Sequence, residues 1–347
     1  MSHKSVDSNM IFANRLDIDG LVYRDIKEAP FRLYGLFYEN GEYFRLPADV
    51  AKNTSDNVYD MYKTATGARL RFVSDSPYVA IRAALSRTER IPNMTFIGTI
   101  GFDLYADGVY AGSFVPSVNE NAYEAIVKLP DRKEREFTVH FPLYANLDAL
   151  EIGLSEDASL LSALDYAVEA PIVFYGSSIT NGACASRPGM AYPAQVGRML
   201  NANHHNLGFG GSARGEKAMA EYIATMPMSA FVLDYDHNAY NPDHLLETHE
   251  PFFKIVREKN PTLPILMITA PKVDRDESWQ KRYEIIKRTY ENAIAAGDKN
   301  VYFLDGAEPL REIGPDYFVD GIHPSDLGFY FMAKAVADIL SRALKQK

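Results

Sequence analysis

The sequence has a single cysteine, Cys184, among its 347 residues. One cysteine cannot form a disulfide within the chain, and it cannot supply the several thiolates of a cysteine-based zinc or iron–sulfur site. No run approaches the roughly 18–20 apolar residues that a membrane-spanning helix requires. The first residues also lack the apolar segment of a signal peptide. We therefore expect a soluble, cytoplasmic protein with no membrane partner.

Basic residues are in deficit, with 36 Lys and Arg against 46 Asp and Glu, for a net charge of −10. Nucleic-acid binding needs a basic surface, so nucleic acid is not expected as a partner. The composition is otherwise that of a globular protein, with 47% hydrophobic and 24% charged residues. The length suggests about two domains of ordinary size.

The first half of the chain has the pattern of many short strands. Alternating apolar and polar runs recur between clusters of Gly, Pro, Asn and Asp, which are typical of turns. Asp107-Gly108 is a strong hairpin signal. The pattern predicts an antiparallel, jelly-roll-like β-sandwich over residues 1–165. The runs lie at 31–38, 43–47, 68–74, 78–85, 96–108, 135–143 and 149–154.

The second half alternates apolar runs with longer amphipathic stretches. The apolar runs fit strands buried on both faces, and the stretches between them have apolar residues three and four apart, as helices do. The alternation predicts a parallel sheet with helices on both faces over residues 166–347. The strands are expected at 171–176, 205–209, 230–236, 264–270 and 301–306, and the helices at 191–200, 216–226, 243–259, 276–297 and 325–345.

Polar clusters follow the predicted strands of this second half. Ligands bind at the carboxyl ends of the strands in such a sheet, so these clusters should meet in one crevice. Ser178 follows the first strand, and Asp320 and His323 precede the last helix. A serine hydroxyl needs an adjacent base to act as a nucleophile. We interpret His323 as that base and Asp320 as the carboxylate that orients its ring.

The same clusters offer donors for the oxyanion of a tetrahedral intermediate. The glycine-rich turn at 208–211 lets a backbone N–H approach a ligand closely. Asn238 can donate from its side-chain amide, and Ser178 from its own N–H. The sequence thus predicts an oxyanion hole of Ser178, Gly211 and Asn238, in a site with no metal and no cofactor.

These residues resemble the motifs of the SGNH (GDSL-type) hydrolases. Ser178 in GSSIT matches the nucleophile of the first block, Gly211 and Asn238 match the second and third blocks, and Asp320 and His323 match the DxxH of the fifth. GFDLY (101–105) and GACASRPGMAYP (182–193) resemble a bacterial subgroup with an N-terminal β-sandwich. The chain departs from the pattern at Ser177, where Asp is usual, and in the third block.

The resemblance implies a flavodoxin-like, three-layer α/β/α catalytic domain and hydrolysis of small acyl esters. We expect an acetyl ester on a carbohydrate or glycoside as the substrate. A first alternative is an acyltransferase, in which the same acyl-enzyme is attacked by an alcohol or amine acceptor. A second alternative is a non-catalytic sugar-binding protein. The N-terminal domain is open to three roles, which are sugar binding, shaping the crevice and forming a homo-oligomer.

Four more residues lie near the predicted crevice. His237 adjoins Asn238, and Arg187 and Arg214 lie in neighbouring loops, so all three are candidates for substrate binding. Cys184, close to Ser178 in sequence, is a rival nucleophile or a buried packing residue, and we favour packing. Asp103 of GFDLY is expected to fix the turn that follows it.

Overall fold

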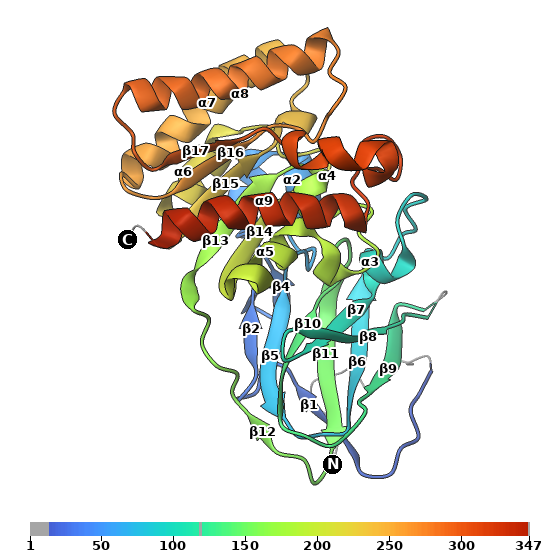
Figure 1. Cartoon of the computed structure of the whole chain (residues 1–347). Coiled ribbons are helices and arrows are strands. Elements are labelled where there is room, and N and C mark those ends of the chain that lie inside the picture. The colour runs from blue at the N-terminus through green and yellow to red at the C-terminus, as the bar shows by residue number, and fades with distance from the viewer. Residues whose placement is uncertain (1–13, 118–119, 346–347) are drawn as a thin grey trace. The chain divides into compact units, whose positions relative to one another are not determined.

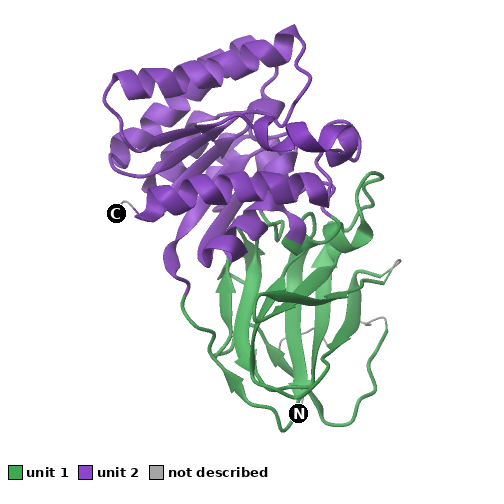
Figure 2. Cartoon of the chain, viewed as in Figure 1, with its two compact units in different colours: residues 1–45, 63–165, 186–189 green, residues 46–62, 166–185, 190–347 purple. Residues whose placement is uncertain are grey.

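The computed structural model describes residues 14–117 and 120–345, and the chain forms two compact units. Figure 2 shows them in different colours. Unit 1 comprises residues 1–45, 63–165 and 186–189, and unit 2 comprises residues 46–62, 166–185 and 190–347. The units are therefore not the two contiguous domains expected from the sequence. Residues 46–62 form two helices, of which the first packs with α6 of unit 2, although both lie within the predicted sandwich region.

Unit 1 is built from antiparallel strands in two main sheets. Over the described residues one sheet has the order β1-β11-β6-β9, and the other has β12-β5-β10-β7-β8 with β2 beside β5. The core draws buried side chains from both, such as Ile81 and Ile152 from the first and Phe72 and Phe137 from the second. The antiparallel sandwich is confirmed.

The strands of unit 1 are β1 (Leu21–Asp25), β2 (Arg32–Tyr34), β3 (Phe37–Glu39), β4 (Glu42–Phe44), β5 (Arg69–Ser74), β6 (Tyr78–Ser86), β7 (Phe102–Ala106), β8 (Val109–Phe114), β9 (Ala122–Lys128), β10 (Arg135–His140), β11 (Asn146–Ser155) and β12 (Leu160–Leu161). The predicted hairpin joins β7 and β8, with positive φ at Asp107 (50°) and Gly108 (77°).

Part of the predicted strand at 96–108 is a helix, α3 (Phe96–Ile100). Its first turn is capped by Thr95, whose hydroxyl accepts a hydrogen bond from the Gly98 N–H at 3.0 Å. A capped turn satisfies amide groups that an isolated strand would leave open, so the local cap outweighs the strand-like residues. The predicted strand at 31–38 is likewise split by Gly35, where φ is +79° and a Cβ would lie 2.9 Å from the carbonyl oxygen of Gly67.

Unit 2 has a five-stranded parallel sheet in the order β14-β13-β15-β16-β17. Numbered from β13, this is the order 2-1-3-4-5 of flavodoxin-like folds. The strands are β13 (Val168–Gly176), β14 (Ala202–Gly208), β15 (Ala230–Asp234), β16 (Ile265–Ile268) and β17 (Val301–Leu304). Every residue of β15 and β16 is buried, which explains their continuous apolar sequences. The predicted parallel α/β architecture is confirmed.

Helices cover both faces of this sheet. Helices α5 and α9 pack together on one face, while α7 packs with α6 and α8 on the other (Figure 1). The helices of unit 2 are α1 (Ala48–Thr54), α2 (Asp56–Met61), α4 (Ser178–Asn181), α5 (Tyr192–Leu200), α6 (Lys217–Thr225), α7 (Pro242–Lys259), α8 (Glu277–Ala295) and α9 (Asp326–Lys345). Short 3-10 segments are η1 (Pro188–Met190), η2 (Asp236–Asn238) and η3 (Glu308–Tyr317).

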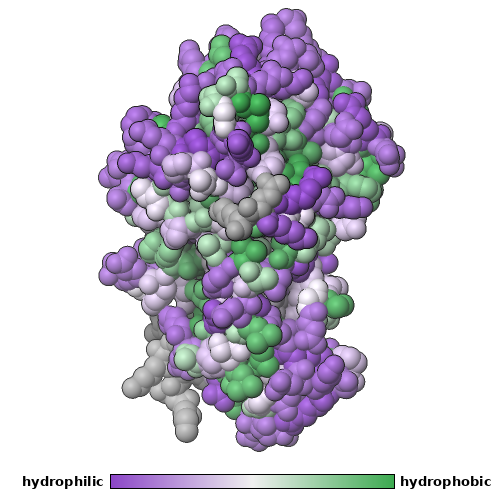
Figure 3. Space-filling model, turned by 60° about the vertical axis from the view of Figure 1, so that its left-hand side comes forward, coloured by the Kyte–Doolittle hydropathy of each residue, from purple (hydrophilic) through white to green (hydrophobic). Residues whose placement is uncertain are grey.

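Among the described residues, none of the helices combines the length and apolar character needed to cross a bilayer. On the face drawn in Figure 3, hydrophilic residues predominate and hydrophobic ones are interspersed among them.

Candidate active site

The nucleophile candidate lies on a tight turn between β13 and α4. Gly176 ends the strand, and a Cβ there would lie 2.0 Å from the Thr180 hydroxyl oxygen and 2.2 Å from the Asp234 carbonyl oxygen. Ser177 caps the helix, because its hydroxyl accepts a hydrogen bond from the Ile179 N–H at 3.2 Å. The serine that replaces the usual Asp thus still anchors the turn. Ser178 follows as the first residue of α4, at the carboxyl edge of the sheet.

Ser178, His323 and Asp320 form one chain of hydrogen bonds. Ser178 Oγ lies 2.9 Å from His323 Nε2, and His323 Nδ1 lies 2.8 Å from Asp320 Oδ2. The other oxygen of Asp320 accepts hydrogen bonds from the N–H groups of Ile322 (3.0 Å) and His323 (2.8 Å). The structure therefore brings together the three residues predicted from the sequence, from two loops 145 positions apart.

The hydrogen bonds also define what the histidine can do. When Nδ1 donates its proton to Asp320, Nε2 has a free lone pair directed at the Ser178 hydroxyl. The loop is fixed because the Val319 N–H donates to the His323 carbonyl oxygen at 2.9 Å. The arrangement can remove a proton from the serine and stabilise the imidazolium that results.

The predicted oxyanion donors lie on two loops that bind each other. The Asn238 amide donates to the Phe209 carbonyl oxygen at 3.0 Å, and the Phe209 N–H donates to the carbonyl oxygen of Gly176 at 2.9 Å. Gly211 has a φ of +68°, which favours glycine, and no heavy atom lies within 4 Å of a Cβ built there. The second and third blocks are therefore fixed against the end of the strand that leads to the nucleophile.

Arg214 binds the glycine-rich loop that carries Gly211. One guanidinium nitrogen donates to the Gly211 carbonyl oxygen at 2.8 Å, and the other donates to the Tyr240 hydroxyl at 2.6 Å. The guanidinium also lies 4.3 Å from the centre of the Tyr240 ring. The residue predicted to bind substrate thus holds the carbonyl group of Gly211, the residue whose N–H is a predicted oxyanion donor.

Arg187 belongs to unit 1 and is bound to the GFDLY motif. Its guanidinium donates to Asp103 at 2.8 Å and to the Tyr105 hydroxyl at 2.6 Å. Asp103 also accepts a hydrogen bond from the Gly189 N–H at 2.9 Å. The expectation that Asp103 fixes the following turn is wrong. Asp107 ties that turn to β10 by accepting a hydrogen bond from the Glu136 N–H, and Asp103 instead binds the segment 186–189.

Two buried acids beneath the nucleophile turn were not identified from the sequence. Asp234 accepts hydrogen bonds from the Thr180 hydroxyl (2.9 Å) and the Tyr192 hydroxyl (2.8 Å). Burial, aided by the charge of Asp236, raises the pKa of Asp234 to about 8. Burial also raises the pKa of Asp236 to about 6. The two aspartates within the apolar run AFVLDYD were the available signal, because a charged residue is costly in a fully buried strand.

His237 is held as a neutral imidazole beside this site. Burial and the neighbouring charges of His323, Arg282 and Lys272 lower its pKa to about 3. Its ring centre lies 4.7 Å from that of Trp279, the only tryptophan in the sequence. A ring with so low a pKa is a weak base, so it is a poor candidate for a second catalytic base, but it can still form hydrogen bonds to a substrate.

Cys184 lies close to the loop that carries Asp320 and His323. Its sulfur and one ligand atom each of Asp320 and His323 all lie within 4.8 Å of one another. Burial raises the pKa of the Cys184 thiol to about 11, with a further contribution from the charge of Asp320. The thiolate is the nucleophilic form, so this environment suppresses the reactivity of Cys184.

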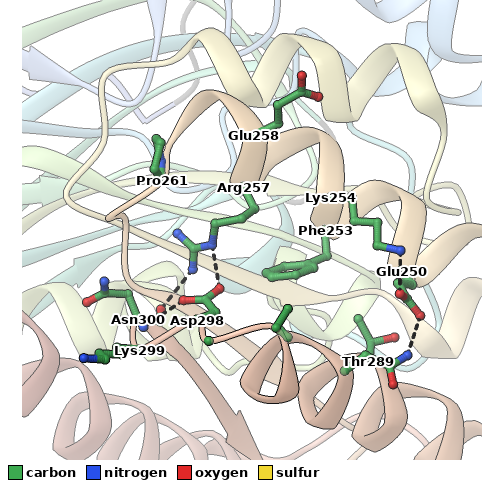
Figure 4. A pocket seen from close by; sticks show the side chains of 14 residues that line it. Glu250, Phe253, Lys254, Arg257, Glu258, Pro261, Thr289, Asp298, Lys299 and Asn300 are labelled. Atoms are coloured by element: carbon green, nitrogen blue, oxygen red, sulfur yellow. Dashed lines mark hydrogen bonds and ion pairs between the residues drawn. The ribbon is translucent and has the colours of Figure 1, made fainter.

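A separate pocket of about 670 Å³ lies between α7 and α8 (Figure 4). Its wall includes the segments just before β16 and β17, so it opens at the amino edge of the sheet, opposite the catalytic loops. Its charged groups pair within the wall, as in Arg257 with Asp298 and Lys254 with Glu250. None of the predicted site residues lines it.

Comparisons with known proteins cover both units. A sequence profile described as "GDSL-like Lipase/Acylhydrolase family" matches residues 169–341, and one described as "N-terminus of Esterase_SGNH_hydro-type" matches residues 21–160. A Bacteroides ovatus protein described as a GDSL-like lipase is 31% identical, with a TM-score of 0.83 over 94% of this chain and 98% of that one. A comparison with curated proteins gave no match.

Two more distant structures share the fold. A salicylyl-acyltransferase from a tetracycline biosynthetic pathway has a TM-score of 0.77 at 19% identity, over 94% of this chain and 98% of that one. An acetyl xylan esterase from the rumen bacterium Butyrivibrio proteoclasticus has a TM-score of 0.60 at 14% identity, over 94% and 99%. At these identities the likeness concerns the architecture.

Proposed function

Because the chain belongs to the GDSL-like lipase/acylhydrolase family and is an enzyme acting on carboxylic esters, we propose that Ser178, His323 and Asp320 are its catalytic triad. The observation that carries this proposal is the unbroken chain of hydrogen bonds from Ser178 Oγ through the imidazole to Asp320. That geometry also argues against the alternative of a non-catalytic sugar-binding protein, which would have no need of it.

In the proposed reaction, His323 Nε2 accepts the proton of the Ser178 hydroxyl as Ser178 Oγ attacks the ester carbonyl. The N–H groups of Ser178 and Gly211 and the amide of Asn238 stabilise the oxyanion. Among the described residues, no acceptor is bonded to the Ser178 or Gly211 N–H, so both are available to substrate. His323 then protonates the leaving alcohol, and the same ring activates the water that releases the acid.

We propose that the substrate is a small acyl ester, and specifically an acetyl ester on a carbohydrate. The fold likeness to the Butyrivibrio proteoclasticus acetyl xylan esterase supports this choice. The likeness to the salicylyl-acyltransferase supports a second candidate, in which an acceptor alcohol or amine replaces water in the second step. Both candidates need the same acyl-enzyme.

The test is acetate release from a panel of acetylated mono- and oligosaccharides. We expect the wild type to release acetate and Ser178→Ala to lose at least about 10³-fold in kcat, as triad substitutions do. Cys184→Ser is the control for the rival nucleophile and should keep activity within about threefold, since the raised pKa makes Cys184 unreactive. Retained activity in Ser178→Ala would overturn the triad.

The same panel separates the two candidates. Acetate release that is independent of added alcohol or amine supports the hydrolase. Transfer of the acetyl group to an added acceptor, with little free acetate, supports the acyltransferase. If the wild type acts on 4-nitrophenyl acetate but on no acetylated sugar, the triad stands and the carbohydrate assignment fails.

A further inference from the structure

A lysine and two aromatic rings lie beside the catalytic loops with no part in the reaction described above. Lys272 follows β16, at the carboxyl edge of the sheet where the catalytic loops also lie. Its ammonium is 5.9 Å from the centre of the Trp279 ring and 6.0 Å from that of Phe318. All three residues belong to unit 2.

Both rings contact residues that adjoin the proposed catalytic and oxyanion-binding residues. Trp279 packs on His237, the residue next to Asn238, with ring centres 4.7 Å apart. Phe318 pairs with Pro324 across a β-bridge, and Pro324 follows His323. The Lys272 ammonium is therefore close to two rings. One contacts His237, beside the proposed oxyanion donor Asn238, and the other lies on the loop of the proposed base His323.

Among the described residues, the charge of Lys272 contacts aromatic rings but is not paired with an acid. No carboxylate or other acceptor is bonded to the ammonium there, and the residue as a whole is half-buried. The two nearby arginines differ, because Arg275 pairs with Asp305 and Arg282 donates to the carbonyl oxygen of Asp236. A cation that no acceptor neutralises is available for a charge-assisted hydrogen bond with an anion that reaches it.

The Nε2 atom of His237 is also without a hydrogen-bond partner. It is buried, and none of the described residues forms a hydrogen bond with it. Because the ring is neutral, it can donate a hydrogen bond to a bound molecule or accept one. The cluster thus presents a cation, a neutral hydrogen-bonding group and the faces of two aromatic rings.

We infer that Lys272, Trp279 and Phe318 form a subsite for an anionic group, a carboxylate or a phosphate, on the alcohol portion of the ester. This inference rests on the proposed function. Phe318 is on the loop of His323, which protonates the leaving alcohol, so the subsite belongs to the leaving group. The rings pack against the apolar face of a sugar, and the ammonium binds the anion that the sugar carries.

The test compares three acetylated methyl glycosides that differ only in the group at C6 and therefore in charge. They are the neutral glucoside, the glucuronoside and the glucoside 6-phosphate, with 4-nitrophenyl acetate as a substrate that carries no anion. Lys272→Met should lower kcat/KM about tenfold for the anionic sugar that binds the subsite, the typical worth of a charge-assisted hydrogen bond. Its kcat/KM for the neutral sugar and for 4-nitrophenyl acetate should stay within about twofold, and Lys272→Arg should retain most of the anionic preference.

Lys281→Met is the matched control. It removes the same charge from α8, which also carries Trp279, but Lys281 is exposed and paired with Glu277. It should leave the ratio of anionic to neutral kcat/KM unchanged. The anionic preference of the wild type should also weaken as salt is raised.

The glucuronoside and the phosphate arms decide which anion the subsite takes. A wild type that prefers neither anion, or a Lys272→Met variant that slows all substrates equally, would overturn the subsite. Either result leaves the triad intact as long as hydrolysis of 4-nitrophenyl acetate depends on Ser178. Loss of that dependence would instead overturn the proposed function.

Discussion

A buried cluster of charges in unit 1 and a buried acid in unit 2 have different kinds of partner. In unit 1, Arg82 on β6 lies between Glu124 on β9 and Glu151 on β11, and all three side chains are largely buried. The antiparallel register sets Arg82 directly opposite both acids, so each carboxylate faces the same guanidinium. In unit 2, Asp234 ends a fully buried strand and is bonded to two hydroxyl groups instead of to a cation.

The difference concerns how each unit accommodates ionisable groups that are costly to bury. In this cluster unit 1 pairs its buried charges, and removing one member of such a cluster is strongly destabilising. In unit 2, three titratable groups with shifted pKa values lie at one edge of the sheet. They are Asp234, Asp236 and His237. Perturbed titratable groups of this kind gather at functional sites. If this comparison is right, substitutions at that edge should change turnover, and substitutions in the ion cluster should change stability.

The largest expected effect is on the orientation of the imidazole. Asp320→Asn should lower kcat by about 10⁴-fold, because an amide that donates to Nδ1 favours the wrong tautomer of His323. The free energy of unfolding in urea should change by less than about 1 kcal/mol, since the Asp320 side chain is partly exposed. A fall in kcat of less than tenfold would show that Asp320 does not orient the ring.

The second test removes the cation of the unit 1 cluster. Arg82→Met leaves two buried carboxylates facing each other and should lower the free energy of unfolding by about 3–5 kcal/mol. Far-UV circular dichroism in urea measures this loss, while fluorescence of Trp279 follows unit 2. The kcat of the folded protein should not change.

Arg132→Met is the control for that substitution. Arg132 pairs with Asp75 and Asp157 on the surface of unit 1, where an ion pair contributes about 1 kcal/mol or less. Equal losses from the two substitutions would contradict the view that the buried cluster matters more than surface pairs.

The third effect concerns the oxyanion. Asn238→Ala should lower kcat by about 10²–10³-fold with a smaller change in KM, because the amide acts on charge that develops in the transition state. Asn241→Ala provides a matched control, since Asn241 only caps α7 by accepting a hydrogen bond from the His244 N–H. It should cost about 1 kcal/mol of stability and leave kcat unchanged. Similar kinetics in both variants would refute the oxyanion role.

The smallest effect is a change in pH dependence. The pKa of Asp234 is raised from 3.8 to about 8, so the folded protein holds this proton while the unfolded chain releases it. Its contribution to stability is therefore complete below about pH 4 and is lost as the pH rises towards 8. Asp234→Asn keeps an acceptor for Thr180 and Tyr192 but cannot titrate.

Relative to the wild type, Asp234→Asn should accordingly become more stable as the pH rises from 5 to 8. Urea unfolding at both pH values measures this difference. Identical pH slopes for the two proteins would mean that Asp234 is already ionised in the fold.

The sequence predicted best what depends on local pattern. The strands of unit 2 followed from their continuous apolar runs, and Ser178, Asp320 and His323 followed from their places after strands and before the last helix. The contacts of Arg187 could not be predicted, because its partner Asp103 is 84 positions away and no local pattern joins them. The helix at Phe96–Ile100 was missed because its residues favour a strand and only the Thr95 cap favours a helix.

The chain passes between the two units several times, so neither unit is one continuous segment. The backbone passes from one unit to the other at residues 45–46, 62–63, 165–166, 185–186 and 189–190. A gene fragment that ends at residue 165 would carry α1 and α2 away from unit 2, to which they belong, and it would lack the segment 186–189, which binds Asp103 of the GFDLY motif. The two units therefore have to be expressed and engineered together as one chain. A domain swap at a single junction leaves both units incomplete.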